Sequence, residues 1–75
     1  MRLDPVSLKL FVSVVRHGSI AAAADDGHIA PAAVSKRISE LESVLRTKLL
    51  MRTNKGVQAT AAGLALSTLA RRLLA

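Results

Sequence analysis

The chain has 75 residues, a formal net charge of +6, no cysteine and a single aromatic residue, Phe11. This length suits one small domain and is too short to enclose a deep active-site pocket. The absence of cysteine excludes disulfides and thiolate metal sites, and no apolar run reaches the ~18 residues of a membrane span. Ala and Leu, which favour helices, are frequent. The basic balance favours a polyanionic partner, either nucleic acid or an anionic membrane surface.

The first predicted helix covers residues 5–17. Asp4 is a suitable N-cap, and Pro5 fits the first helical position. Gly18 is expected to end this helix and Ser19 to cap the next one. One apolar stripe is expected to face the core, with the members Leu8, Phe11, Val12 and Val15.

A helix-turn-helix follows. The alanine-rich residues 20–26 predict a helix of about two turns. Gly27 breaks it, and residues 27–30 predict a tight turn before Pro31 begins a third helix. Two helices joined by a turn of about four residues that contains glycine is the pattern of a helix-turn-helix.

The third predicted helix, residues 31–46, has two contrasting faces. Its apolar face consists of Val34, Ile38, Leu41 and Leu45. At about 100° per residue, the opposite face consists of Ala32, Lys36, Ser39 and Ser43, with Ser35 at its border. Because this second face is small, polar and cationic, it is suited to entering a groove of a nucleic acid.

Residues 48–59 predict a short two-stranded hairpin, or wing. Two apolar segments, 48–52 and 57–59, flank the turn residues 53–56, where Asn and Gly tolerate the positive φ of a hairpin turn. Thr60 is then expected to cap a helix that runs to Ala75. One stripe of that helix consists of Ala62, Leu66, Leu69 and Leu73, and a second of Ala61 and Leu64. A helix that is apolar around most of its circumference needs partners on more than one side, so this stripe is expected to serve the core, a dimer interface, or both.

Short motifs occur in a fixed order over about residues 3 to 72. They are Phe11-Val12 with Val14, Gly18-Ser19, Ala23-Ala24, residues 33–38 followed by Leu41-Glu42, Leu49-Leu50, Arg52-Thr53, Lys55-Gly56-Val57, and Thr60 with Ala62-Gly63. In order and spacing they resemble the N-terminal DNA-binding domain of LysR-family transcription regulators. The resemblance implies a mostly α winged helix-turn-helix, with a three-helix core, a short two-stranded wing and a long C-terminal linker and dimerisation helix.

The same resemblance implies a domain organisation and partners. Residues 1–59 are expected to form the DNA-binding domain and residues 60–75 the start of the linker helix, with the effector-binding domain absent from this chain. The expected partners are double-stranded DNA carrying an interrupted inverted repeat, a second copy bound through the C-terminal helix, and a small-molecule effector bound only by the absent domain. No cofactor and no membrane partner is expected, and the expected location is the cytoplasm.

The chain departs from the family pattern at five positions. Where the family usually opens its recognition helix with Ser-Gln-Pro-Ala, Ala30 replaces the serine cap and Pro31 the glutamine that commonly contacts bases. Ala22 replaces a basic residue, Gly27 a core leucine and Leu50 a phenylalanine.

The residues expected to contact DNA are Pro31, Ala32, Ser35, Lys36, Arg37, Ser39, Arg52, Thr53, Asn54 and Lys55. Six basic and two acidic residues lie between Lys36 and Lys55, a net charge of +4; the alternative is an ordinary solvated surface. Ser35 and Lys36 are the base-reading candidates, although a phosphate contact alone is the alternative for Lys36. Arg37 is expected to bind a phosphate or an acidic neighbour such as Glu40 or Glu42. The wing tip is expected to reach the backbone or the minor groove.

Catalysis is not expected. His17 and His28 lack metal-ligand spacing, and the adjacent Asp25 and Asp26 diverge by about 100° on a helix. Neither a nucleophile elbow nor a glycine-rich phosphate loop occurs. Two other functions compete with DNA binding: a membrane-surface module anchored by the last helix, and a protein-interaction module that has lost DNA binding. The arginines of the last helix cluster at one end, which disfavours the membrane module.

Overall fold

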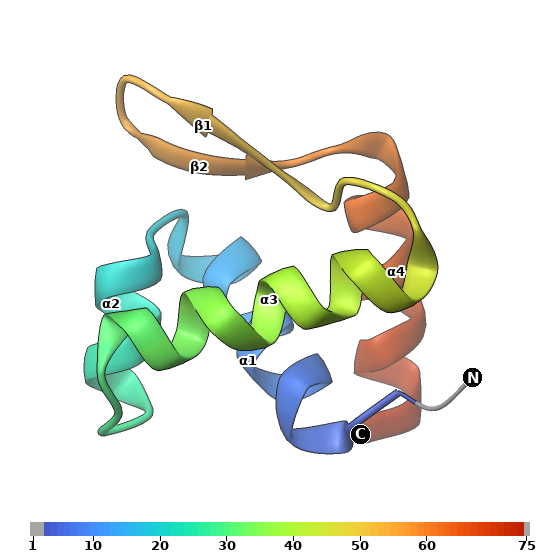
Figure 1. Cartoon of the computed structure of the whole chain (residues 1–75), viewed down its shortest axis with the longest axis horizontal. Helices are drawn as coiled ribbons and strands as arrows, with labels where there is room; N and C mark the ends of the chain where they lie inside the picture. Colours follow the sequence, from blue (N-terminus) through green and yellow to red (C-terminus); the bar gives the residue numbers. More distant parts are fainter. Residues whose placement is uncertain (1–2, 75) are drawn as a thin grey trace.

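A computed structural model gives the fold and describes residues 3–74. The elements in chain order are α1 Pro5–His17, α2 Ile20–Asp26, α3 Pro31–Leu45, β1 Leu50–Thr53, β2 Gly56–Ala59 and α4 Ala61–Leu74 (Figure 1). This order confirms the winged helix-turn-helix expected from the sequence. Residues 1–2 of the predicted domain and Ala75 of the predicted linker helix lie outside the described residues. Within the described chain, each helix is too short or too polar to cross a membrane.

Local capping signals set the ends of the first two helices as the sequence predicts. The Asp4 carboxylate accepts a hydrogen bond from the Val6 N–H at 2.9 Å, and Pro5 begins α1. Gly18 ends α1 with a left-handed φ of 67°. The Ser19 hydroxyl oxygen then accepts the Ala22 N–H at 3.1 Å and starts α2.

The turn between α2 and α3 contains one strained position, His28, whose φ is 55°. Pro31 begins α3 after Ala30, which provides no side-chain cap. The helix ends at Leu45, because Arg46 adopts the left-handed conformation and forms its C-cap with φ 53°. The predicted end at about Arg46 is therefore correct to one residue.

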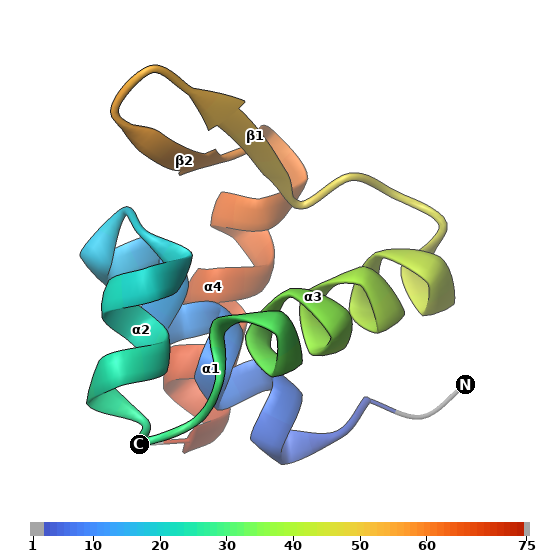
Figure 2. The ribbon, with the colours of Figure 1, turned by 60° about the vertical axis from the view of Figure 1, so that its left-hand side comes forward.

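The core surrounds α1, which contacts α2, α3, α4 and β2. Figures 1 and 2 show α1 behind α3 and between α2 and α4. The core residues are Leu8, Phe11, Val14, Ala23, Ala24, Val34, Ile38, Leu41, Leu49, Val57 and Ala70. Sequence periodicity placed Val12 and Val15 in the core stripe, yet both are half-buried, whereas Val14 is fully buried. The predicted apolar stripe was narrower than the buried surface of α1, because α1 is covered by neighbouring elements on several sides.

The wing is a single antiparallel hairpin, in which Leu50 pairs with Ala59 and Thr53 pairs with Gly56. The turn is therefore shorter than predicted. It consists of Asn54 and Lys55, and of the predicted turn residues 53–56 Gly56, now the first residue of β2, is the one with a positive φ, 132°. Strand β2 is fixed to the end of α1, because the Gly18 carbonyl accepts the Val57 N–H at 3.1 Å.

Helix α4 faces the core with small residues. Thr60 caps it by accepting the Gly63 N–H at 3.0 Å. Its buried residues are Gly63, Ser67 and Ala70. Of the predicted leucine stripe only Leu66 is packed against the core; the others, like Leu64, are exposed, with Leu73 at 77%. Of the two roles expected for the stripe, the core role therefore applies to Leu66, and the role in a dimer interface stays a prediction.

Candidate nucleic-acid interface

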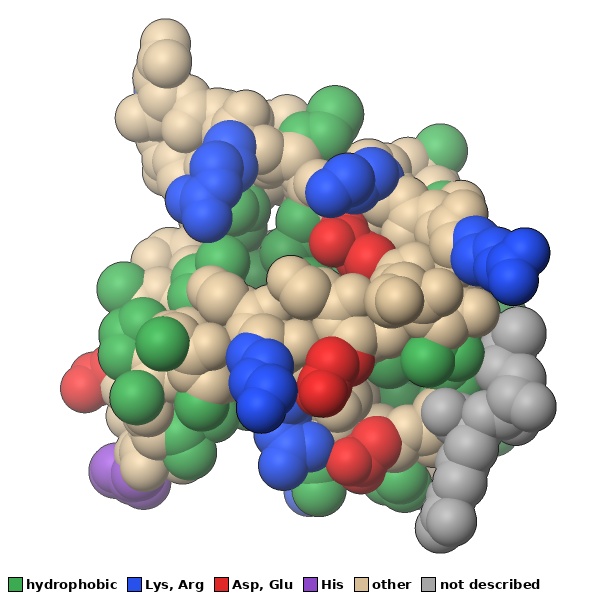
Figure 3. Space-filling view, in the orientation of Figure 1, with side chains coloured by type: hydrophobic (Ala, Val, Ile, Leu, Met, Phe, Trp, Pro, Cys, Tyr) green, Lys and Arg blue, Asp and Glu red, His purple; other side chains and the backbone are tan. Residues whose placement is uncertain are grey.

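The outward face of α3 is small, polar and cationic. Ala32, Lys36 and Ser39 are exposed, and Ser35 is half-buried. The opposite face buries Val34 and its core neighbours. The two faces of α3 therefore lie as the sequence predicts, and the helix crosses the front of the molecule with its outer surface uncovered (Figures 1 and 3).

The first turn of α3 presents only small side chains. Pro31, Ala32 and Ala33 are all exposed. The Ala30 carbonyl accepts the N–H groups of Ala33 and Val34 at 3.0 and 3.3 Å, which holds the turn without a side-chain cap. The wall of a nucleic-acid groove can therefore approach this end of α3 closely, because no long side chain projects from it.

The tip of the wing is exposed and cationic. Arg52, Thr53, Asn54 and Lys55 all face solvent. The Thr53 hydroxyl oxygen accepts the Lys55 N–H at 3.2 Å, which orders the turn. Within residues 3–74 the ion pairs are Arg37–Asp4 and Lys48–Glu42. The cations of Arg52 and Lys55, like that of Lys36, therefore have no carboxylate within salt-bridge distance in the described chain.

A hollow of about 470 Å³ separates α3 from the wing. Ser35 and Ser39 line it from α3, and Arg52 lines it from β1. Figure 3 shows this hollow below the wing, with basic side chains on its upper rim. The fold thus brings together residues of the third helix and of the wing that are separated in sequence, and they form one concave surface.

Arg37 is engaged within the domain. Its Nη1 donates to Asp4 Oδ2 at 3.0 Å and to Ser7 Oγ at 3.4 Å. The sequence predicted a phosphate or an acidic neighbour such as Glu40 or Glu42; the partner is acidic, but it is Asp4 rather than either glutamate. Helical spacing favoured a neighbour on α3, whereas the tertiary fold brings the N-cap of α1 alongside. The guanidinium therefore joins α3 to α1.

Sequence reasoning missed the role of Glu42. Its Oε2 accepts the N–H groups of Leu49 and Leu50 at 2.8 and 3.3 Å, and its Oε1 lies 4.0 Å from Lys48 Nζ. The side chain is only 17% exposed. The Leu41-Glu42 motif marks the position without indicating a role, because a contact to a backbone seven residues away has no local sequence signal.

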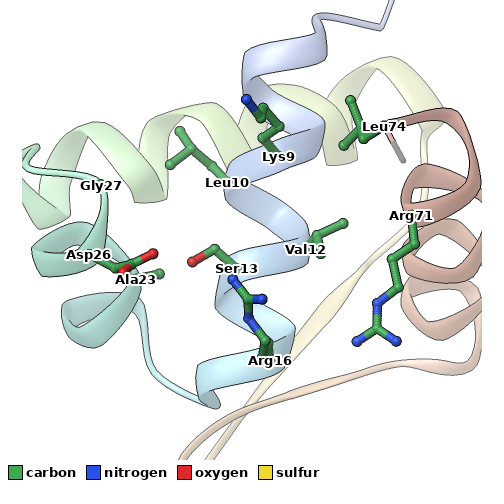
Figure 4. Close-up of a pocket in the computed structure, with 10 residues that line it drawn as sticks. All are labelled: Lys9, Leu10, Val12, Ser13, Arg16, Ala23, Asp26, Gly27, Arg71 and Leu74. Atoms are coloured by element: carbon green, nitrogen blue, oxygen red, sulfur yellow. The ribbon is translucent and has the colours of Figure 1, made fainter.

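A second groove, of about 500 Å³, lies across α1 on the side away from α3. Figure 4 shows α1 as its floor, Asp26 on α2 at one side, and Arg71 with Leu74 on α4 at the other. Arg16 and Lys9 of α1 also line it. None of the residues predicted to contact DNA lines this groove, so the candidate interface is confined to α3 and the wing.

Residues 6–64 match the family model described as "Bacterial regulatory helix-turn-helix protein, lysR family". Among curated relatives, the chain is 46% identical over 67 residues to the nitrogen assimilation regulatory protein nac of Escherichia coli, a match that covers 89% of this chain and 22% of the relative. It is 45% identical over 61 residues to the transcriptional regulator YofA of Bacillus velezensis, covering 81% of this chain and 21% of the relative. The chain thus spans about a fifth of the length of these relatives.

Solved structures match nearly the whole chain. The CbnR_DBD–DNA complex aligns with a TM-score of 0.91 at 37% identity, over 95% of this chain and 82% of that one. The complex of BenM_DBD with catB site 1 DNA aligns with a TM-score of 0.91 at 35% identity, over 95% of this chain and 79% of that one. With the family model covering most of its length, the chain belongs to the LysR family of bacterial regulatory helix-turn-helix proteins.

Proposed function

We propose that this chain binds double-stranded DNA sequence-specifically as the DNA-binding domain of a LysR-type transcription regulator. Helix α3 enters the major groove with Ala32, Ser35, Lys36 and Ser39 toward the bases. The wing lies on the phosphate backbone or in the minor groove. Serine and lysine on α3 supply the donors and acceptors that read base edges, while arginine and lysine on the wing neutralise phosphates.

One observation carries this proposal: Ser35 and Ser39 of α3 and Arg52 of β1 line one hollow, and the exposed cations of Lys36, Arg52 and Lys55 have no carboxylate within salt-bridge distance in the described chain. A small, cationic helix face beside a cationic hairpin suits a duplex, whose groove admits a helix and whose backbone flanks it. The two similar solved domains are titled as DNA complexes, which supports the same use of this surface.

The partners of the whole protein form part of the proposal. The exposed leucines of α4 mark a surface for a second copy, and a two-fold dimer presents two copies of α3 to an inverted repeat. Residues 1–59 serve as the DNA-binding domain and residues 60–75 begin the linker helix. Effector sensing belongs to sequence outside this chain, because the relatives are several times longer. Such a regulator acts in the cytoplasm, where the DNA is, and performs no catalysis.

The test is selection of DNA by the chain itself. The 75-residue protein is incubated with a random duplex library, bound molecules are amplified over several rounds, and the enriched duplexes are sequenced. The proposal expects an enriched site with two-fold symmetric half-sites, and weaker binding to it by Lys36→Ala and Arg52→Ala. No enrichment over the starting library, with tight binding to anionic vesicles instead, would favour the membrane-surface alternative.

A further inference from the structure

Glu42 connects α3 to the wing. It lies near the C-terminal end of α3, and its carboxylate accepts two consecutive backbone N–H groups, those of Leu49 and Leu50, where the chain enters β1. Within residues 3–74 these are the side-chain hydrogen bonds that join α3 directly to the wing segment.

The other attachments of the wing lead to α1 and α4. At the end of α1, the Gly18 carbonyl accepts a hydrogen bond from the Val57 N–H. Thr60, which caps α4, donates its hydroxyl to the Lys48 carbonyl at 2.7 Å and its N–H to the Leu49 carbonyl at 3.0 Å. The open hollow lies between α3 and the wing (Figure 3). Among the described residues that line it, Glu42 is the acidic one. Of these attachments, those of Glu42 are the ones that run directly from a side chain of α3 to the start of the wing.

We propose that Glu42 is a positioning residue that fixes the wing at a set distance from α3, so that both elements engage one duplex at the same time. This inference rests on the proposed DNA binding. Glu42 itself contacts backbone amides rather than DNA. Its carboxylate is negatively charged, as the phosphates of DNA are, so it would not attract them directly. Its contribution to binding is therefore indirect and passes through the wing cations Arg52 and Lys55.

Two variants of Glu42 change different properties of the side chain, one its length and the other its charge. Glu42→Asp keeps the charge and shortens the side chain by one methylene, so the carboxylate no longer reaches both N–H groups. Glu42→Gln keeps the reach and one acceptor oxygen. Glu40→Asp, at an exposed position on the same helix, is the matched control for the change in helix propensity. Binding is measured by fluorescence anisotropy with the duplex selected by the unaltered chain.

The expected result is a loss in Glu42→Asp only. Without the contribution of two wing cations, affinity at 0.1 M salt falls between about ten- and a hundredfold, and the salt dependence becomes flatter by about two for each bound copy. Glu42→Gln and Glu40→Asp bind within about threefold of the unaltered chain, the margin for a change at an exposed position. Amide exchange of Leu49 and Leu50 accelerates in Glu42→Asp, whereas the amides of Ile38 and Leu41 keep their protection.

A double-mutant cycle tests the route through the wing. In a background with Arg52→Ala and Lys55→Ala, adding Glu42→Asp should change affinity by less than about threefold, because the wing contacts are already absent. A full additional loss of affinity in that background would overturn the proposal. Loss of the helical circular dichroism signal in Glu42→Asp would also overturn it. Either result would mean that Glu42 stabilises the whole domain rather than the position of the wing. If the unaltered chain selects no duplex, the proposed function fails, and the positioning role falls with it.

Discussion

Gly63, in the first turn of α4, lies so close to the backbone of Leu49 that a Cβ atom at position 63 would overlap the Leu49 carbonyl oxygen. The same carbonyl accepts the Thr60 N–H at 3.0 Å. The start of α4 is therefore held directly against the chain entering the wing, and only glycine permits this approach.

Replacing Gly63 by alanine should destabilise the fold. The added methyl group meets backbone atoms, which cannot rotate away as a side chain could, so the expected cost is about 1–3 kcal/mol. Urea unfolding followed by circular dichroism measures this as a lower midpoint with an unchanged slope. A midpoint equal to that of the unaltered chain would show that the two backbones separate easily.

Replacing Gly27 by alanine should have the opposite effect and serves as the matched comparison. Gly27 has an ordinary φ of −87°, and a Cβ atom there would meet Leu10 Cδ2 at 3.7 Å and the Ala23 carbonyl oxygen at 3.4 Å. These are normal contacts, and alanine restricts the unfolded chain more than glycine does. The expected gain in the free energy of unfolding is about 0.4–1 kcal/mol, measured by the same urea titration. A loss of stability would show that the turn after α2 needs glycine.

The features that the sequence predicted correctly are mostly set by neighbouring residues. Asp4, Gly18, Ser19, Pro31 and Thr60 each begin or end a helix as expected, through contacts within four residues of their own position. The exposed face of α3 also followed from local periodicity, because that helix buries only one side.

The features that it did not predict depend on which elements meet in space. Periodicity reveals that α4 is apolar but not which side faces α1, so the small residues of the core side were overlooked. The partner of Arg37 is 33 residues away in sequence, and Glu42 accepts the N–H groups of Leu49 and Leu50, where the chain enters β1. No pattern within α3 distinguishes these residues from ordinary surface charges.

Binding to DNA should weaken steeply with salt. If each copy neutralises about three or four phosphates, a dimer neutralises about six to eight, and the slope of log K against log salt is roughly −5 to −7. The exposed cations of α3 and the wing motivate this value. Anisotropy titrations at several potassium chloride concentrations measure the slope. A value shallower than about −2 would be inconsistent with phosphate contacts from both elements.

Variants of α3 and of the wing should differ in selectivity. Lys36→Ala or Ser35→Ala should weaken the selected duplex more than a random duplex, by roughly 1–3 kcal/mol, because a base contact is lost. Lys55→Ala should weaken both duplexes about equally and flatten the salt slope by about one. Titrating each variant with both duplexes makes the comparison. An equal loss on both duplexes for Lys36→Ala would assign Lys36 to a phosphate.

The last prediction concerns assembly through α4, which we expect to pair antiparallel, or nearly so, with α4 of a second copy. The predicted interface consists of Ala62, Leu66, Leu69 and Leu73. Ala62, Leu69 and Leu73 are exposed, and Leu66 lies between them and the core. An apolar stripe of this kind on a small domain usually marks an interface, and the small residues on the core side of α4 leave these leucines available for a partner.

Two leucines of equal exposure provide the test. Leu69 and Leu64 are each 56% exposed, but they lie about 140° apart around α4. Leu69→Ser should weaken dimerisation tenfold or more, because burial of one leucine contributes about 1.5–3 kcal/mol, whereas Leu64→Ser should leave it nearly unchanged.

Sedimentation equilibrium with and without the selected inverted repeat measures the stoichiometry. Because the dimer is favoured when both half-sites are occupied, the unaltered chain should bind two copies per repeat even where the free protein is monomeric. One copy per repeat, together with a free protein that is monomeric at millimolar concentration, would exclude the dimer. Equal weakening of dimerisation by Leu69→Ser and Leu64→Ser would show that the interface is not the predicted stripe.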